Sequence, residues 1–392
     1  MYKIQMLNKI ASTGLDLFPH DDYEIASSLV SPDAILVRSC DMHGMEFSST
    51  LKAVARAGAG VNNIPVPELT EKGIVVFNTP GANANAVKEF VLLALLLSNR
   101  QAFAATEWLK TLAGKGDGIT ELAEKGKSQF AGPELKGKTL GVIGLGAIGA
   151  MVANAAIDLG MKVIGYDPFM SVSAAWHLNT HVAHAETLDS LLAKSDYVTI
   201  HMPQTNETKG FINADKLAEM KNGVRVINFA RGGLVNNADM IAAIESGKVA
   251  MFVTDFAAEE FINNPKIICF PHLGASTPEA EENCAVMAVQ QLRAFLETGV
   301  IENSVNFPRV VTDSPIPKNG MRLCIANKNV PGIVSKFSTI LGEAKLNIAG
   351  MINQNRGDVA YNIIDIDGLI AGDTLAKLIL IENVALVRPI FG

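Results

Sequence analysis

The hydrophobic positions of the chain form short apolar runs, separated by longer stretches with apolar residues at helical spacing. Runs such as Ala34–Arg38, Ile74–Asn78 and Thr139–Ile143 lack the alternation of apolar and polar residues that marks a half-exposed strand. Strands that are buried on both faces show this pattern, and they occur in parallel sheets covered by helices. The sequence therefore predicts an α/β fold with doubly wound sheets.

The same pattern continues through most of the chain. Further strands are expected at Lys162–Tyr166, Tyr197–His201, Arg225–Asn228 and Ala250–Asp255, and helices from about Asn83 through the LLALLL segment, at Ala238–Ser246 and at Glu279–Thr298. Between Gly114 and Pro133 the many Gly and Lys residues predict a surface excursion. The last 72 residues follow the order strand, helix, strand, strand, helix, strand. This βαββαβ order is the ferredoxin-like pattern.

Composition narrows the class of protein. The chain of 392 residues is 48% hydrophobic and 19% charged, with a formal net charge of −7. These values indicate a globular protein rather than a disordered or coiled-coil one, and the acidic charge argues against nucleic-acid binding. The longest apolar run, Phe90–Leu97, is shorter than the roughly 20 residues of a membrane-spanning helix. A cytoplasmic protein that contacts neither membrane nor nucleic acid is expected.

Cysteine spacing gives no metal or disulfide signal. Cys40, Cys269, Cys284 and Cys324 are scattered, with no C-x-x-C pair and no histidine at metal-ligand spacing. We therefore expect reduced thiols and no metal site.

A glycine-rich turn after the strand Thr139–Ile143 carries the first chemical signal. Gly144, Gly146 and Gly149 form a G-x-G-x-x-G pattern that leads into a helix, and Asp167 ends the next strand. This context is that of a dinucleotide site, in which the glycines permit a tight turn, close approach of the pyrophosphate and close helix packing. A carboxylate at Asp167 binds a ribose diol and repels a 2′-phosphate, so the sequence predicts NAD rather than NADP.

Three later segments place reactive side chains directly after predicted strands. The first contains Arg231, the second contains the pair Glu259–Glu260 shortly after Asp255, and the third contains His272. A guanidinium binds a carboxylate, a neutral imidazole accepts a proton from a hydroxyl group, and a nearby carboxylate orients the imidazole. Together with NAD as hydride acceptor, these groups are what the oxidation of a 2-hydroxy acid requires. The residues alone do not choose between Glu259 and Glu260.

The motifs ELKGKTLGVIGLGAIG, NFARGGLV, TDFAAEE and PHLGAST together resemble the D-2-hydroxyacid dehydrogenase family, over residues 1–305. The resemblance implies that Arg231 binds substrate and that Glu260 and His272 form the acid–base dyad, with Glu260 five residues beyond Asp255. It implies further cofactor contacts at Thr79, Ala147, Ile148, Met202, Phe229, Ala230, Asp255, Gly274 and Ala275. It also implies a substrate domain of residues 1–95 completed by 286–310, and an NAD-binding Rossmann domain of residues 96–285.

Two segments resemble the phosphoglycerate dehydrogenases within this family. They are Arg38-Ser39 and RAGAGVNNI, which begins at Arg56, and the resemblance implies that both arginines hold a substrate phosphate. Lys127 is the best match for a cation that the neighbouring subunit supplies. The chain departs from the usual pattern at Cys40 and Asn62. The expected substrate is therefore a phosphorylated 2-hydroxy acid.

Beyond a linker at residues 311–320, the segment RLCIANKNVPGI begins a domain, residues 321–392, that resembles an ACT domain. The resemblance implies pairing with a partner subunit in a homodimer or homotetramer, and L-serine as an effector. Asn329 and Asn347 match ligand-contacting positions, and Asn327 stands where serine-sensitive enzymes have histidine.

Alternative functions remain open. A glyoxylate or hydroxypyruvate reductase shares the dyad but needs no phosphate pocket. A non-catalytic NAD-sensing protein shares the fold, and the ACT segment alone is compatible with an amino-acid sensor.

Overall fold

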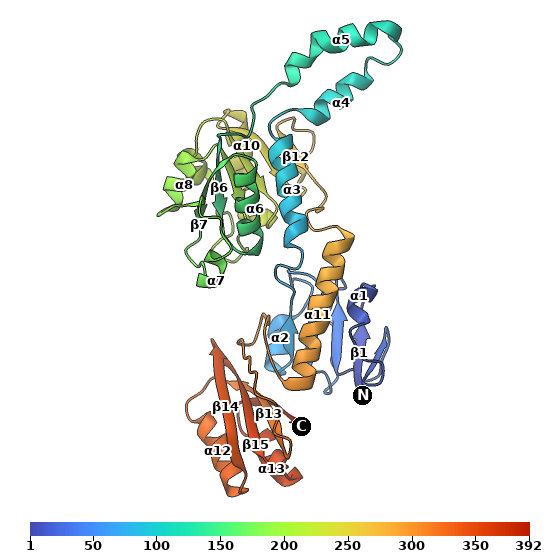
Figure 1. Cartoon of the computed structure of the whole chain (residues 1–392), viewed down its shortest axis with the longest axis vertical. Helices are drawn as coiled ribbons and strands as arrows, with labels where there is room; N and C mark the ends of the chain where they lie inside the picture. The colour runs from blue at the N-terminus through green and yellow to red at the C-terminus, as the bar shows by residue number, and fades with distance from the viewer. The chain divides into compact units, whose positions relative to one another are not determined.

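A computed structural model describes residues 1–392, apart from the side chain of Ser173. The chain divides into two units (Figure 1). The first contains Met1–Asn83 and Pro278–Gly392, and the second contains Ala84–Thr277. Each unit is built around its own parallel sheet, as the strand pattern predicts.

The first unit contains a five-stranded parallel sheet. Its strands are β1 (Tyr2–Met6), β2 (Tyr23–Ala26), β3 (Ala34–Val37), β4 (Ala53–Arg56) and β5 (Val75–Phe77), in the order β2-β1-β3-β4-β5. Helices α1 (Ser12–Leu15) and α11 (Pro278–Thr298) cover one face, and α2 (Val66–Glu71) covers the other. This is the flavodoxin-type order, which reverses direction between β1 and β3.

The second unit contains a seven-stranded parallel sheet. Its strands are β6 (Thr139–Ile143), β7 (Lys162–Tyr166), β8 (Ala183–His184), β9 (Tyr197–Ile200), β10 (Val224–Asn228), β11 (Val249–Thr254) and β12 (Ile267–Cys269). The order β12-β11-β10-β9-β6-β7-β8 contains the Rossmann order, which reverses between β6 and β9. The predicted doubly wound fold is confirmed for both sheets.

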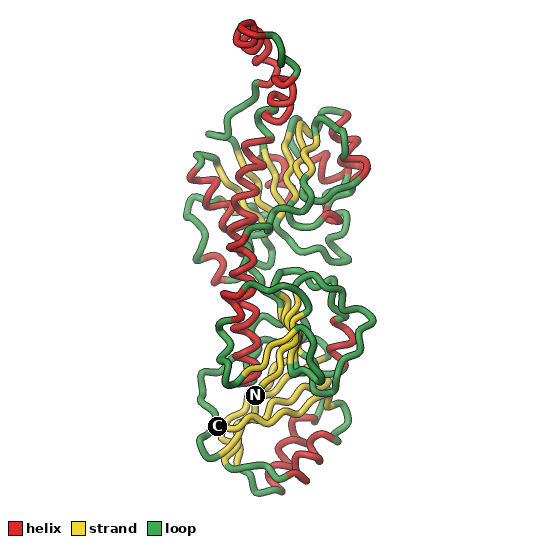
Figure 2. Tube along the Cα trace, turned by 90° about the vertical axis from the view of Figure 1, so that its right-hand side faces the viewer, coloured by secondary structure: helices red, strands yellow, loops and turns green.

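Helices cover both faces of the seven-stranded sheet (Figure 2). On one face lie α3 (Ala84–Leu97) and α6 (Ala147–Asp158), and on the other lie α8 (Leu188–Lys194), α9 (Ala214–Glu219) and α10 (Asn237–Glu245). Helix α7 (Val172–Ala175) is a single short turn after β7. The apolar side chains of α3, including Val91 and Leu95, pack in the same core as Leu140 and Val152. Helix α3 thus belongs to the second unit, although the sequence analysis assigned residues up to 95 to the first domain.

Residues 320–391 form a separate antiparallel sheet with two helices. The elements are β13 (Gly320–Lys328), α12 (Ile333–Glu343), β14 (Asn347–Arg356), β15 (Val359–Asp367), α13 (Gly372–Ile379) and β16 (Val384–Phe391), and the strand order is β14-β15-β13-β16. The predicted ferredoxin-like βαββαβ fold is confirmed.

The ferredoxin-like domain shares a core with the end of α11. Tyr361 and Cys324 pack in one cluster with Phe295 and Leu296. Arg388 donates to the carbonyls of Phe295 and Leu296 at 2.6 and 2.8 Å, so the last carbonyls of α11 have side-chain partners. The first unit therefore includes this domain as a packed part.

The predicted excursion after α3 is helical. It contains α4 (Ala102–Lys110), a 3-10 turn (Gly116–Gly118), α5 (Ile119–Gly126) and a second 3-10 turn (Lys127–Phe130). None of the described residues in these four elements is buried. The high Gly and Lys content thus marked exposure correctly, while the short helices were missed.

Candidate functional site

The three glycines of the turn between β6 and α6 meet three different demands. Gly144 has φ +88°, and a Cβ there would lie 2.7 Å from the carbonyl oxygen of His201. A Cβ on Gly149 would lie 1.9 Å from the carbonyl oxygen of Gly144, whereas a Cβ on Gly146 would meet nothing within 4 Å. The turn is therefore tight at both ends and open at Gly146, which fits the approach of a pyrophosphate.

The surroundings of this turn also fit a dinucleotide. Helix α6 begins at Ala147 without a side-chain cap, so its first N–H groups are available to an anion. Asp167 accepts hydrogen bonds from the backbone N–H groups of Leu145 and Phe169, at 2.8 and 2.9 Å. The carboxylate is thus fixed at the end of β7, beside the turn. Ala147, Ile148 and Asp167, for which the sequence predicts cofactor contacts, thus lie in or beside this turn.

His201 forms one wall of the turn. Its carbonyl faces Gly144, and its Nε2 lies 2.9 Å from the hydroxyl oxygen of Thr199. Burial lowers the pKa of His201 to about 3, so the imidazole is neutral near pH 7. No motif of the sequence points to this residue.

The remaining predicted cofactor residues of the second unit follow strands of the same sheet. Met202 follows β9, Phe229 and Ala230 follow β10, Asp255 follows β11, and Gly274 and Ala275 follow β12. Because all these strands are parallel, their carboxyl ends lie at one edge of the sheet. The ring of Phe229 packs against those of Phe90 and Phe270, which also contact each other, in the core. Thr79 is fully buried in the first unit.

Asp255 holds the segment that carries His272. Its Oδ1 accepts from the N–H of Leu273 and its Oδ2 from the N–H of Gly274, both at 2.7 Å. Burial raises the pKa of Asp255, while these hydrogen bonds lower it. His272 itself has φ +57°, a conformation that side-chain-bearing residues rarely adopt and that needs support from the surrounding structure. Asp255 supplies that support, a role that the sequence analysis did not assign to it.

Phe256 connects the His272 segment with the Arg231 segment. Its ring centroid lies 5.2 Å from that of His272, and a Cβ on Gly232 would approach its Cβ to 3.0 Å. Arg231 is exposed, with Nη1 donating to the carbonyl of Ala230 at 2.7 Å. Gly232, the residue after Arg231, and His272 thus both lie against Phe256.

Glu260 has a different partner from the one the sequence analysis implies. Its Oε1 accepts from Asn237 Nδ2 at 2.8 Å. The N–H of Glu260 and this amide lower the pKa of the exposed carboxyl group. Among the described contacts, Glu260 is therefore bound to Asn237 rather than to His272, and Asn237 is a residue that the sequence motifs did not reveal.

In the first unit, the turn of Arg38, Ser39 and Cys40 follows β3. All three backbone N–H groups donate to Oδ1 of Asn8, at 2.9–3.1 Å. Arg56 Nε donates to the carbonyl of Arg38 at 2.8 Å, and Arg56 Nη1 donates to the carbonyl of Gly60. The guanidinium of Arg38 pairs with Glu281. The two arginines expected to hold phosphate thus already have partners in the protein.

The other predicted ligand residues lie apart. Lys127 is in the helical excursion, where its Nζ lies 2.5 Å from Glu124 Oε2. Asn327 is buried and accepts from Asn362 Nδ2 at 2.6 Å. Asn347 pairs in register with Asp367, at the end of the sheet opposite to the end where Lys328 pairs with Val359. One chain therefore does not bring Asn347 together with Asn327 and Asn329.

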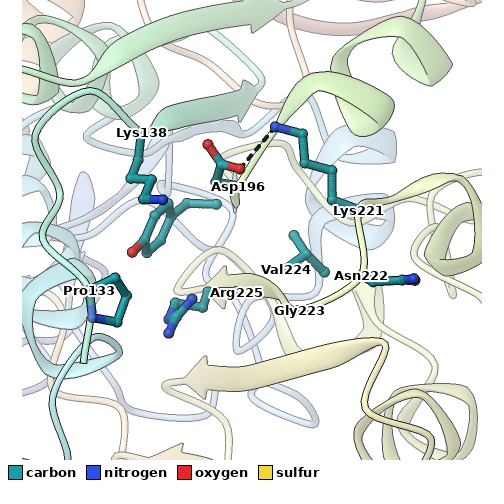
Figure 3. Close-up of a pocket in the computed structure, with 9 residues that line it drawn as sticks. Pro133, Lys138, Asp196, Lys221, Asn222, Gly223, Val224 and Arg225 are labelled. Carbon is teal, nitrogen blue, oxygen red and sulfur yellow. Dashed lines mark hydrogen bonds and ion pairs between the residues drawn. The ribbon is translucent and has the colours of Figure 1, made fainter. Parts of the chain in front are cut away.

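A hollow of about 190 Å³ lies at the opposite edge of the seven-stranded sheet, where β6, β9 and β10 begin (Figure 3). Asp196 there accepts from Lys221 Nζ at 2.9 Å and from the N–H of Thr139 at 2.8 Å. Arg225 Nε donates to the carbonyl of Ser98. None of the predicted site residues lines this hollow, whose lining is within the described part of the chain.

The described part of the chain shows neither a metal-binding cluster nor a membrane-spanning helix. Among the residues that the structure describes, no three His, Cys, Asp or Glu side chains gather in a way that could hold a metal ion. None of the helices in the described chain is both long and apolar enough to cross a membrane.

Comparison with known proteins shows what the central segment is similar to. Residues 92–274 match the model of the D-isomer specific 2-hydroxyacid dehydrogenase, NAD binding domain. A D-3-phosphoglycerate dehydrogenase of Synechocystis is 34% identical over 332 residues, which are 80% of this chain and 57% of that protein. A D-3-phosphoglycerate dehydrogenase of Bacillus subtilis is 33% identical over 331 residues, 80% of this chain and 60% of that protein. The chain thus spans less than two thirds of the length of these relatives.

Solved structures agree with the fold. The NAD⁺-bound 3-phosphoglycerate dehydrogenase of Entamoeba histolytica has a TM-score of 0.61 at 24% identity, covering 78% of this chain and 98% of that one. The apo D-mandelate dehydrogenase of Rhodotorula graminis has a TM-score of 0.67 at 23% identity, covering 80% and 99%. At these identities the similarity concerns the fold.

The sequence relatives confirm the resemblance to D-3-phosphoglycerate dehydrogenases that the motifs indicated, and the ACT resemblance of residues 321–392 stays a prediction. The family match and the open glycine turn both support NAD as the cofactor. Residues 92–274 are therefore similar to the NAD-binding domain of the D-isomer specific 2-hydroxyacid dehydrogenases.

Proposed function

We propose that the protein oxidises D-3-phosphoglycerate to 3-phosphohydroxypyruvate with NAD, the first step of L-serine biosynthesis. The observation that carries the proposal is the common edge at which Arg231, His272 and the glycine turn lie, after parallel strands of one sheet. The names of the curated relatives support the choice of substrate. Bound NAD supplies the hydride acceptor.

In this proposal His272 accepts the proton of the substrate hydroxyl group, and Arg231 binds the substrate carboxylate. Arg231 is exposed and bound to a neutral carbonyl, so a carboxylate can replace that partner in a charge-assisted hydrogen bond. Asp255 and Phe256 fix the position of His272 through the backbone and the ring. Glu260 keeps its negative charge near pH 7, and it orients and stabilises the protonated imidazole through the oxygen that Asn237 does not use.

The test is NADH formation by the purified chain with NAD and D-3-phosphoglycerate, run beside D-glycerate. Replacing His272 with Asn removes the proton acceptor, and we expect kcat to fall about 10²- to 10⁴-fold with little change in NAD affinity. NAD affinity, measured by fluorescence titration, is the control for a folded cofactor site. Unchanged turnover in the variant would contradict the role of His272.

A glyoxylate or hydroxypyruvate reductase is the second candidate, and one observation favours it. Arg56 is bound to backbone carbonyls and Arg38 to Glu281, so neither guanidinium is held ready for a phosphate. Turnover of glyoxylate or D-glycerate without turnover of the phosphorylated acid would select this candidate.

The proposal includes a cytoplasmic homodimer or homotetramer, with L-serine as an effector of the C-terminal domain. Because Asn347 and Asn329 lie near opposite ends of their sheet, an effector site that uses both needs a second copy of the chain. Inhibition by L-serine, together with the mass of the assembly from light scattering, tests this part.

A further inference from the structure

The pair of Arg38 and Glu281 lies where the five-stranded sheet is expected to bind ligands. Arg38 follows β3, which neighbours β1 at the point where the strand order reverses. In open α/β sheets, ligands bind beyond the carboxyl ends of the strands at this point. Arg38 Nη2 donates to Glu281 Oε1 at 2.5 Å, and each side chain is 43% exposed. The contact is therefore accessible to a dissolved anion.

The backbone of Arg38 is fixed while its guanidinium remains exchangeable. Asn8 binds the N–H of Arg38, and Arg56 binds its carbonyl. The guanidinium has five N–H donors, and the contact with Glu281 uses one Nη2–H. A half-exposed ion pair of this kind contributes little stability. An incoming anion of higher charge can therefore displace Glu281 from Arg38 at small cost.

We propose that Glu281 is a specificity-determining residue, which competes with the phosphoryl group of the substrate for Arg38. This inference rests on the proposed function. A phosphate monoester carries nearly two negative charges near pH 7, whereas the Glu281 carboxylate carries one. The phosphoryl group therefore displaces the carboxylate, and the uncharged hydroxymethyl end of D-glycerate does not. Glu281 thus neutralises Arg38 until a phosphorylated substrate arrives, and it raises the substrate concentration that binding requires.

The first turn of α11 offers a matched control. Glu279 and Glu281 are both acidic residues of this turn, where negative charge stabilises a helix N-terminus. Glu281→Gln and Glu279→Gln each remove one charge from the same turn, and only the first removes the partner of Arg38. Comparing the two variants separates the pairing from the general change in charge.

Steady-state kinetics with D-3-phosphoglycerate and D-glycerate test the inference. In Glu281→Gln we expect KM for the phosphorylated acid to fall about three- to tenfold, with the change confined to KM. We expect no change with D-glycerate, and none with either substrate in Glu279→Gln. In the double variant with Arg38→Gln, the gain from Glu281→Gln should disappear because the cation is gone.

Calorimetric binding of D-3-phosphoglycerate to the NAD-loaded protein separates this inference from the proposed function. If no 2-hydroxy acid is turned over, the proposed function is wrong, and the affinity for the phosphorylated acid must still rise in Glu281→Gln. Unchanged or weaker binding in that variant, an equal gain in Glu279→Gln, or no binding to any of the proteins overturns the role of Glu281.

Discussion

The two parallel sheets each have a turn at the point where the strand order reverses, and the two turns are built differently. In the seven-stranded sheet the turn after β6 depends on missing side chains, because Gly144 and Gly149 leave no room for a Cβ. In the five-stranded sheet the turn after β3 depends on side chains, because Asn8 binds its N–H groups and Arg56 its first carbonyl.

This difference determines what each turn offers to a ligand. The glycine turn presents uncapped backbone N–H groups at the start of α6, and the close contacts at Gly144 and Gly149 fix its backbone. The turn of Arg38 has its N–H groups occupied and offers a guanidinium that already has a partner. The first turn is therefore pre-organised, and the second exchanges one anion for another.

The largest expected effect comes from filling the glycine turn. Gly149→Ala places a Cβ against the carbonyl of Gly144, and we expect a loss of about 3 kcal/mol in the free energy of unfolding, measured with urea. Gly146→Ala is the matched control, since its Cβ meets open space. It should keep stability within about 1 kcal/mol and still weaken NAD binding. Equal stability of the two variants would contradict the packing argument.

The next effect concerns His201 and pH. Its pKa of about 3 in the folded protein lies below the unfolded value of about 6.5, so below that value the unfolded chain binds a proton that the folded chain does not. The contribution of neutral His201 to the free energy of unfolding is therefore fully present above about pH 6.5 and is lost as the pH falls below that value. Between pH 7 and pH 5 we expect a loss of about 1–2 kcal/mol in chemical denaturation, which His201→Asn should remove. A variant with the same pH dependence as the wild type would refute this.

A smaller effect is expected from the turn of Arg38. Asn8→Ala removes the acceptor of three backbone N–H groups, and because the site is exposed to water we expect a loss of about 1 kcal/mol in thermal or urea unfolding. Asn62→Ala, at an exposed position, should change stability by less than about 0.5 kcal/mol. If Asn8→Ala lost as little stability as Asn62→Ala, water would fully replace Asn8 as the acceptor of the three N–H groups, which would contradict the prediction.

The smallest effect is expected for the ion pair itself. Arg38→Gln breaks the contact with Glu281, and both side chains are 43% exposed, so stability should change by about 0.5 kcal/mol or less. Urea unfolding at low and high salt measures it. A loss above about 2 kcal/mol would show that the pair is structural, and that an incoming anion cannot displace Glu281 cheaply.

Much of the fold could be predicted because its signals are local. Strands β6 and β7 were predicted with their observed bounds, Thr139–Ile143 and Lys162–Tyr166. The continuous apolar run of β6 marks a strand covered on both faces. The division of the chain was harder. The apolar side of α3 fits either sheet by pattern alone, and only packing with α6 assigns it to the second unit.

In the candidate site, too, the sequence predicted some features and not others. The motifs around Arg231, Glu260 and His272 were visible as reactive residues after strands, whereas the partners of these residues were not. Asn237 belongs to helix α10 and binds Glu260, and Phe256 lies beside His272. Neither residue type signals such a role in a sequence, because hydrogen bonds and ring contacts between distant segments leave no periodic pattern.

The sequence by itself determined the two doubly wound sheets, the ferredoxin-like C-terminal order and the glycine turn, because each depends on residues close together in the chain. Tertiary structure decided which side chains meet. Glu281 pairs with Arg38 across 243 positions, and Asp255 holds the His272 segment from the neighbouring strand end. Such pairs arise because the ends of parallel strands, and in the first unit the start of α11, come together at one edge of a sheet. Spacing along the chain does not encode that proximity.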